Sequence, residues 1–257
     1  MSEWTRIARP DSALFDTERL RSQWNRLHLG DAEPWPKDPA LQQAWLLFHN
    51  GEFQQAAEAG LALGDAGLNV ANKATCIHAS YVERRESSRE ALLLEAAARA
   101  EGLQQRQPDN PGAWYWQAYA LGRYGQGISV AKALTQGLGV RVKTALENTL
   151  RLCPQHADAH LALASFHAEV IDKVGHLIGS MTYGADKAAG LALYDKAMSL
   201  NPDSAVTLTE CANGLVMLEG EQRLAQATAL LDRAAAMEPL DAMERLYVAS
   251  AKVALTN

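Results

Sequence analysis

Residues 184–218 read GADKAAGLALYDKAMSLNPDSAVTLTECANGLVML, and the repeat unit of the chain is visible in this stretch. Apolar and small residues recur at helical spacing until Asn201-Pro202, where proline stops the first helix and a second helix pattern follows. The apolar arc of residues 184–200 covers roughly 200° of the helical wheel, about twice what a lone surface helix needs. Only Ala192, Asp195, Lys196 and Ser199 form a narrow polar face. We therefore expect this helix to be covered on two sides, as stacked repeats require.

The same helix–stop–helix pattern recurs along the chain. The prolines that close successive helix pairs are residues 108, 154, 202 and 239, with gaps of 46, 48 and 37 residues. A tetratricopeptide (TPR) repeat has about 34 residues, which leaves excesses of 12, 14 and 3 residues. The first two excesses match glycine-containing insertions at 125–139 and 173–184. The pattern predicts TPR-type repeats, of which the third and fourth carry insertions.

The predicted fold class is all-α, because no segment has the alternation of a strand. We expect a right-handed superhelical TPR-like solenoid of about five helix pairs with a C-terminal capping helix. Residues 1–39 are assigned to an N-terminal arm, a first helix over about 16–29 and a proline-rich linker. Residues 40–257 are assigned to the repeat domain, with pairs at about 40–64, 70–108, 111–154, 156–202 and 203–239 and a cap at 241–255.

The register of the repeats predicts where two helices cross closely. TPR helices need small residues at the crossing and a large residue that fills the next groove. Counting back from the closing prolines gives three small–large–small sets: Gly190, Tyr194 and Ala197; Ala227, Leu231 and Ala234; and, with a poorer fit, Val142, Leu146 and Thr149.

Composition narrows the class of protein. The formal net charge is -6 and no Lys/Arg run exceeds Arg84-Arg85, which argues against nucleic acid as a partner. The three cysteines are widely spaced and are expected to be free thiols in a reducing compartment. The N-terminus lacks the apolar core of a signal peptide and no apolar run is long enough for a membrane span, so the expected location is cytoplasmic.

Three segments carry a resemblance to a known group of proteins. They read AWYWQAYALGRYGQGISVAKALTQG (113–137), RLCPQHADAHLALA (151–164) and ALYDKAMSLNPDSA (192–205). From about residue 109 to 218 the chain resembles TPR proteins of the regulator-of-microtubule-dynamics type and the related bacterial TPR proteins associated with TRAP transporters. The resemblance implies a helical-repeat adaptor rather than an enzyme.

The predicted partner site is the concave groove lined by the first helix of each pair. An aromatic and polar stripe there suits a peptide or protein partner. The alternative is that the stripe contacts the insertions or the terminal helix. Trp114 and Trp116 are assigned to core packing. The groove residues are Tyr115, Tyr119 and Arg123 in the third repeat, Leu161, Ser165 and Glu169 in the fourth, and Thr209, Asn213 and Met217 in the fifth, with Asn72, Thr75 and Glu83 as an extension.

The insertions support a second hypothesis, in which the protein carries a small or lipid-like apolar molecule. Apolar side chains among glycines could close a pocket over the groove, although such insertions more often pack as short extra helices. The pocket residues would be Ile128, Leu134, Leu177, Ile178, Met181 and Tyr183.

The sequence predicts no catalytic residue, metal site or cofactor. His156, His160 and His167 share a helix face, but the last two are about 10.5 Å apart along the axis, too far to share one ion. GRYGQG at 122–127 follows a helix and lacks the lysine of a phosphate loop. The predicted function is a non-enzymatic interaction scaffold, for which self-association is a further option.

Overall fold

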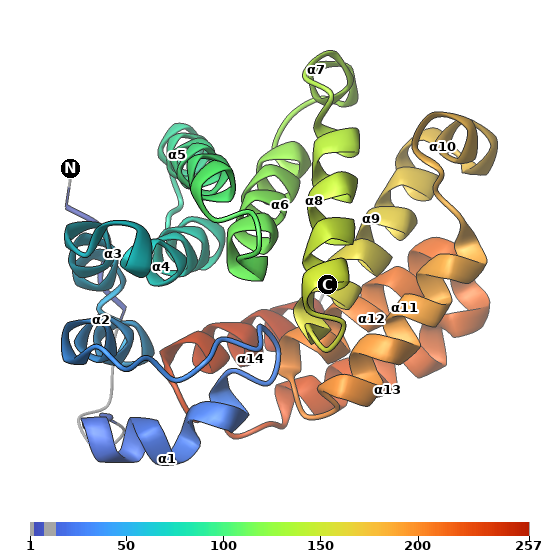
Figure 1. Cartoon of the computed structure of the whole chain (residues 1–257). Coiled ribbons are helices and arrows are strands. Elements are labelled where there is room, and N and C mark those ends of the chain that lie inside the picture. The colour runs from blue at the N-terminus through green and yellow to red at the C-terminus, as the bar shows by residue number, and fades with distance from the viewer. Residues whose placement is uncertain (1–2, 8–13, 257) are drawn as a thin grey trace. The chain divides into compact units, whose positions relative to one another are not determined.

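The computed structural model describes residues 3–7 and 14–256. Every regular element assigned in these residues is a helix, so the predicted all-α class is confirmed (Figure 1). Residues 1–2 and 8–10 of the predicted arm lie outside the described residues. None of the described helices is long and apolar enough to cross a membrane.

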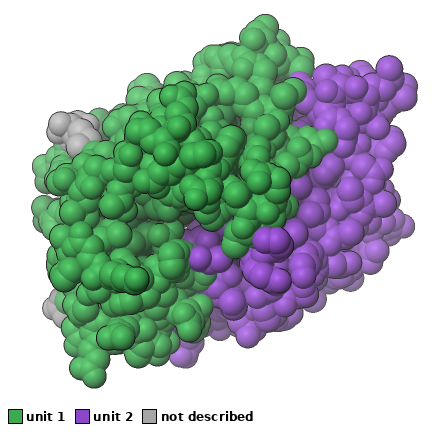
Figure 2. All heavy atoms as spheres, in the orientation of Figure 1, with its two compact units in different colours: residues 1–28, 33–153, 241–243 green, residues 29–32, 154–240, 244–257 purple. Residues whose placement is uncertain are grey.

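The chain forms two compact units, which Figure 2 shows in different colours. Unit 1 comprises residues 1–28, 33–153 and 241–243, and unit 2 comprises residues 29–32, 154–240 and 244–257. The repeats are therefore shared between the units, and each unit also contains a short segment that is remote in sequence from its remainder.

Unit 1 is built from three helix pairs, in which the two helices of a pair are in contact and the first helices of successive pairs also touch. A short helix, α1 (Thr17–Leu27), contacts the first pair. The pairs are α2 (Pro39–His49) with α3 (Phe53–Ala62), α4 (Leu68–Tyr81) with α5 (Glu86–Arg106), and α6 (Pro111–Gln126) with α8 (Leu138–Leu152), with η2 (Gly64–Gly67) before α4 and α7 (Val130–Thr135) inside the third pair.

Unit 2 contains two further pairs and the C-terminal helix, and the first helices of its two pairs are again in contact. Its apolar core includes residues from both pairs and from the last helix, among them Leu208, Leu230 and Val248. The elements are α9 (Ala157–Val174) with α11 (Lys187–Leu200), α12 (Ala205–Glu219) with α13 (Leu224–Ala235), the inserted α10 (His176–Tyr183), η3 (Gly220–Arg223) and α14 (Ala242–Ala254).

Capping side chains explain the helix boundaries of residues 184–218. Asp186 accepts a hydrogen bond from the Ala189 N–H at 2.8 Å at the start of α11. Ser204 does the same for Thr207 at 3.3 Å, just after the Asn201-Pro202 stop. Such caps satisfy backbone donors that the first helical turn leaves without a partner.

The helix crossings follow the predicted register. Gly190, Tyr194 and Ala197 are all buried on α11. An added Cβ at Gly190 would lie 3.2 Å from the His167 Cβ, and one at Gly214 would overlap the Tyr194 phenol. Only a glycine leaves room for the tyrosine at this crossing. The two other predicted sets are also buried, except Leu231, which is half-buried: Ala227 and Ala234 on α13, and Val142, Leu146 and Thr149 on α8.

The polar face of α11 is also as predicted. Ala192, Asp195, Lys196 and Ser199 are the four residues expected to face solvent, and all four are exposed. The remaining face packs against α9 and α12, which explains why its apolar arc is so wide.

Replacing Ala197 by tryptophan should lower the free energy of unfolding by a few kcal/mol, because the indole would overpack a fully buried helix crossing. Urea denaturation followed by circular dichroism measures this change. Ala192→Trp is the matched control, since Ala192 lies on the exposed face of the same helix and should have little effect. Equal stabilities of the two variants would show that the register is wrong.

Candidate functional site

Tyr119 and Arg123 lie one turn apart on α6, beside α4, and both are half-buried. The Tyr119 hydroxyl donates to the Ser80 Oγ at 3.3 Å. The Arg123 guanidinium lies 5.4 Å from the centre of the Tyr119 ring, and its Nη2 is 3.5 Å from the Tyr81 hydroxyl. Burial raises the pKa of the Tyr119 hydroxyl, so the phenol is neutral at physiological pH. These residues form a corner of aromatic, hydroxyl and cationic groups between two first helices.

Tyr115 lies in the core, although the sequence places it in the groove. It is 4% exposed and packs edge-on against Trp116, with ring centroids 4.9 Å apart. Trp114, which the sequence assigns to the core, is instead half-buried. Its indole N–H donates to the Pro108 carbonyl at 2.9 Å. Trp116 is 3% exposed and lies in the core as predicted, so the face of α6 that enters the core includes Tyr115 and Trp116 but not Trp114.

Asn72, Thr75 and Glu83, the residues expected to extend the stripe onto α4 and its C-terminal end, form hydrogen bonds within the protein. Arg99 of α5 donates to the Asn72 Oδ1 at 3.0 Å and to the Thr75 Oγ1 at 2.7 Å, and both acceptor residues are buried. Glu83 is also buried and pairs with Arg85 at 3.2 Å. The Arg99 contacts join the two helices of the second pair to each other.

The predicted groove residues of unit 2 differ in accessibility. Ser165 is bound by the Tyr194 hydroxyl at 3.1 Å, which links α9 to α11. Glu169 pairs with Lys173 at 3.3 Å on the surface of α9. Thr209 is half-buried and Asn213 is exposed on α12. Leu161 belongs to the apolar core, and Met217 is 40% exposed.

The insertions form short helices whose apolar side chains mostly face solvent. On α10, Leu177, Ile178 and Met181 are 73%, 58% and 81% exposed. On α7, Leu134 is 46% exposed, and Ile128 before it is half-buried. Tyr183 is half-buried, with its ring centroid 6.4 Å from that of Phe166. Such exposure does not support an enclosed apolar pocket made by these residues.

The three histidines of α9 have structural roles. His156 caps the helix by accepting from the Ala159 N–H at 3.1 Å, and His167 accepts from the Asp186 N–H at 2.9 Å. His160 contacts the Pro154 carbonyl at 3.0 Å. Residues 3–7 and 14–256 contain no group of three or more side chains suited to hold a metal ion.

The structure shows a buried Asp–His–His chain that sequence reasoning missed. The His49 Nδ1–H donates to the Asp241 Oδ2 at 2.7 Å, and the Nε2 atoms of His28 and His49 are 3.1 Å apart. All three residues are buried, and the Trp24 ring stacks on His28 at 3.8 Å. Since 192 residues separate His49 from Asp241, no local pattern could reveal the contact. Its evident role is to hold residues 241–243 in unit 1.

His78 of α4 is a second unexpected feature. It is 0% exposed, the Trp4 ring stacks on it at 4.5 Å, and neither of its ring nitrogens has a hydrogen-bond partner among the described residues. A buried polar atom without a partner costs about 1–3 kcal/mol. Burial lowers the pKa of His78 to about 4, against a smaller opposing effect of the nearby Glu83 carboxylate.

Comparison with known proteins identifies the fold. The chain is similar to a thermophilic TPR protein of Thermus thermophilus, with a TM-score of 0.58 over 83% of this chain and 97% of that chain. At 17% sequence identity this likeness shows the fold alone. No protein-family profile matches the chain, and no curated protein sequence is significantly similar to it. The predicted TPR-like fold is confirmed, and the resemblance to one TPR subgroup stays a prediction.

Because of His78, the protein should be less stable in mild acid. The unfolded state binds a proton near pH 6.5, whereas the folded state does so only near a pKa of about 4. Stability is therefore lost as pH falls through this window, by about 1–2 kcal/mol between pH 7 and pH 5.

Urea denaturation at both pH values checks this prediction. His78→Gln should remove that part of the pH dependence, and His176→Gln, which changes an exposed histidine, should keep it. An unchanged pH dependence in His78→Gln would contradict the assignment.

Proposed function

We propose that this protein is a non-enzymatic scaffold that binds a peptide or protein partner on the faces of its first helices. TPR-like folds generally mediate protein–protein interaction, and the likeness to a TPR structure supports this class of function. The partner surface includes the Tyr119–Arg123 corner of unit 1. In unit 2, Glu169, Thr209 and Asn213 remain the predicted contacts. Of the other predicted contacts, Tyr115 of unit 1 is buried, and Ser165 of unit 2 accepts a hydrogen bond from Tyr194.

The Tyr119–Arg123 pair is the observation that carries this proposal. Tyrosine and arginine are enriched among the residues that dominate binding energy at protein interfaces. Here Ser80 orients the phenol and the phenol orients the guanidinium, so the Tyr119 and Arg123 side chains would lose little entropy when a partner binds. Both side chains are half-buried and therefore keep part of their surface for contact.

Other features agree with a binding role rather than catalysis. Burial raises the pKa of the Cys76 and Cys211 thiols to about 12, which makes them poor nucleophiles. The net charge of -6 opposes binding to nucleic acid. The free cysteines support the cytoplasmic location expected from the sequence. The exposed apolar residues of α10 give no support to the carrier hypothesis.

Tyr119→Ala combined with Arg123→Ala should weaken partner binding at least about tenfold, because both central contacts are removed. The partner is first captured on the immobilised wild-type chain and identified by mass spectrometry. It is then purified, and its affinity for each variant is measured by calorimetry.

Arg151→Ala is the matched control, since Arg151 is exposed on α8, a second helix, and its loss should leave affinity unchanged. Circular dichroism checks that the double variant is folded. If a folded double variant binds the partner as tightly as the wild type, the corner is not the site.

A further inference from the structure

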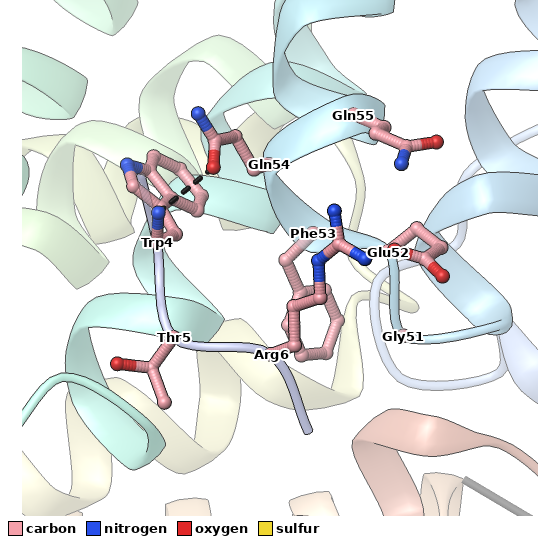
Figure 3. A pocket seen from close by; sticks show the side chains of 8 residues that line it. All are labelled: Trp4, Thr5, Arg6, Gly51, Glu52, Phe53, Gln54 and Gln55. Atoms are coloured by element: carbon pink, nitrogen blue, oxygen red, sulfur yellow. Dashed lines mark hydrogen bonds between the residues drawn. The ribbon is translucent and has the colours of Figure 1, made fainter. Parts of the chain in front are cut away.

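Residues 4–7 of the N-terminal arm are bound to the first two helix pairs of unit 1 as an extended peptide would be. Figure 3 shows Trp4, Thr5 and Arg6 running past the turn between α2 and α3 and the first residues of α3. The Trp4 backbone N–H donates to the side-chain Oε1 of Gln54 at 2.8 Å. The Trp4 side chain is 7% exposed and stacks on His78 of α4 with an interplanar angle of 20°. Trp4 is thus an aromatic anchor that lies outside all helices.

A second anchor follows three residues later. Gly51 has φ +84°, and an added Cβ there would lie 2.7 Å from the Cδ1 of Ile7. The glycine is therefore needed both for the turn and for the close approach of this aliphatic side chain. Thr5 and Arg6, between the two anchors, are exposed.

The same turn also holds the backbone of Phe15. The Asn50 side-chain amide accepts from the Phe15 N–H at 2.8 Å and donates to the Phe15 carbonyl at 3.0 Å. One amide that binds both backbone groups of a residue recognises the chain itself, whatever its side chain. Asn50 therefore fixes the chain at Phe15, where the arm leaves the site, and Gln54 provides the backbone contact within the site. The aromatic and aliphatic anchors provide the specificity.

The surface beneath the arm has two features of a ligand-binding site, a buried histidine and a small hollow. His78 is fully buried beneath Trp4 with neither ring nitrogen paired among the described residues. A hollow of about 30 Å³, enough for a water molecule, lies between the arm and residues 51–55. The Trp4 backbone is held by the Gln54 side-chain amide, and its ring is held by stacking on His78.

We propose that the α2–α3 turn and α4 form a peptide-binding site that the protein's own N-terminal arm occupies. The partner it takes is an extended segment with a tryptophan and, three residues later, a β-branched aliphatic residue. Such a segment displaces the arm, places its tryptophan on His78 and its aliphatic side chain on Gly51. This site does not include Tyr119 or Arg123, so the experiments on it test a proposal independent of partner binding at the Tyr119–Arg123 corner.

The arm acts as a competitor because it is tethered. A segment on a short linker has an effective concentration in the millimolar range, so an outside peptide must overcome that advantage. Removing the tryptophan anchor in the full chain should therefore open the site without changing the surface that recognises the peptide.

The probe is a fluorescein-labelled peptide with the sequence of residues 2–8, SEWTRIA, titrated by fluorescence anisotropy into full-length variants. The Trp4→Ala chain should bind it at least about tenfold more tightly than the wild type. Thr5→Ala is the matched control and should behave as the wild type, since Thr5 is exposed in the same segment. Replacing the peptide's tryptophan by alanine, or adding Gln54→Ala to the Trp4→Ala chain, should weaken binding at least about tenfold.

A second measurement uses the unaltered chain, in case Trp4→Ala disturbs folding. Hydrogen exchange of the backbone amides at residues 3–7 should quicken at saturating unlabelled peptide, while exchange in α3 stays slow. The proposal is overturned by a folded Trp4→Ala chain that fails to bind the peptide or binds it no better than wild type. Unchanged exchange at residues 3–7 overturns it too. So does a wild-type dimer that Trp4→Ala dissolves, because the arm would then serve a second copy.

Discussion

Neighbouring helices approach one another closely at glycine and alanine, and this packing organises both units. In unit 2 the Tyr194 ring fits against Gly214 with no room for a side chain there, and its hydroxyl reaches Ser165. Second helices such as α5 and α11 thereby contact the first helix of their own pair and that of the next. Because this packing repeats, the first helices share one face, and that face is where a partner could meet several repeats within a unit.

The same packing decides which polar residues remain for function. Within the second pair, Arg99 donates hydrogen bonds to the side-chain oxygens of Asn72 and Thr75. Within the fourth pair, Tyr194 donates one to Ser165. At the α4–α6 junction the tyrosine–arginine pair keeps part of its surface outside the core. A polar stripe at helical spacing therefore contains both residues that form internal hydrogen bonds and residues that stay partly exposed, and the position of the neighbouring helix decides which is which.

Features determined by local chemistry could be predicted from the sequence, whereas those determined by distant contacts could not. Small residues at fixed spacing before the Asn201-Pro202 stop predict the buried set Gly190, Tyr194 and Ala197. The rotation of α6 differs from the prediction, because the Trp114 indole bonds to the Pro108 carbonyl and Tyr115 enters the core. The Asp241–His49 hydrogen bond and the stacking of Trp4 on His78 join segments that are far apart in the sequence. Helical periodicity does not predict such contacts.

If the faces of the first helices bind a partner, the backbone amides of those helices must respond when the partner is added. Chemical-shift mapping of the ¹⁵N-labelled chain with its purified partner measures this response residue by residue. We expect the largest shifts to fall in α4 and α6, around Ser80 and Tyr119. Shifts confined to the exposed faces of the second helices α5 and α8 would contradict binding at the first helices.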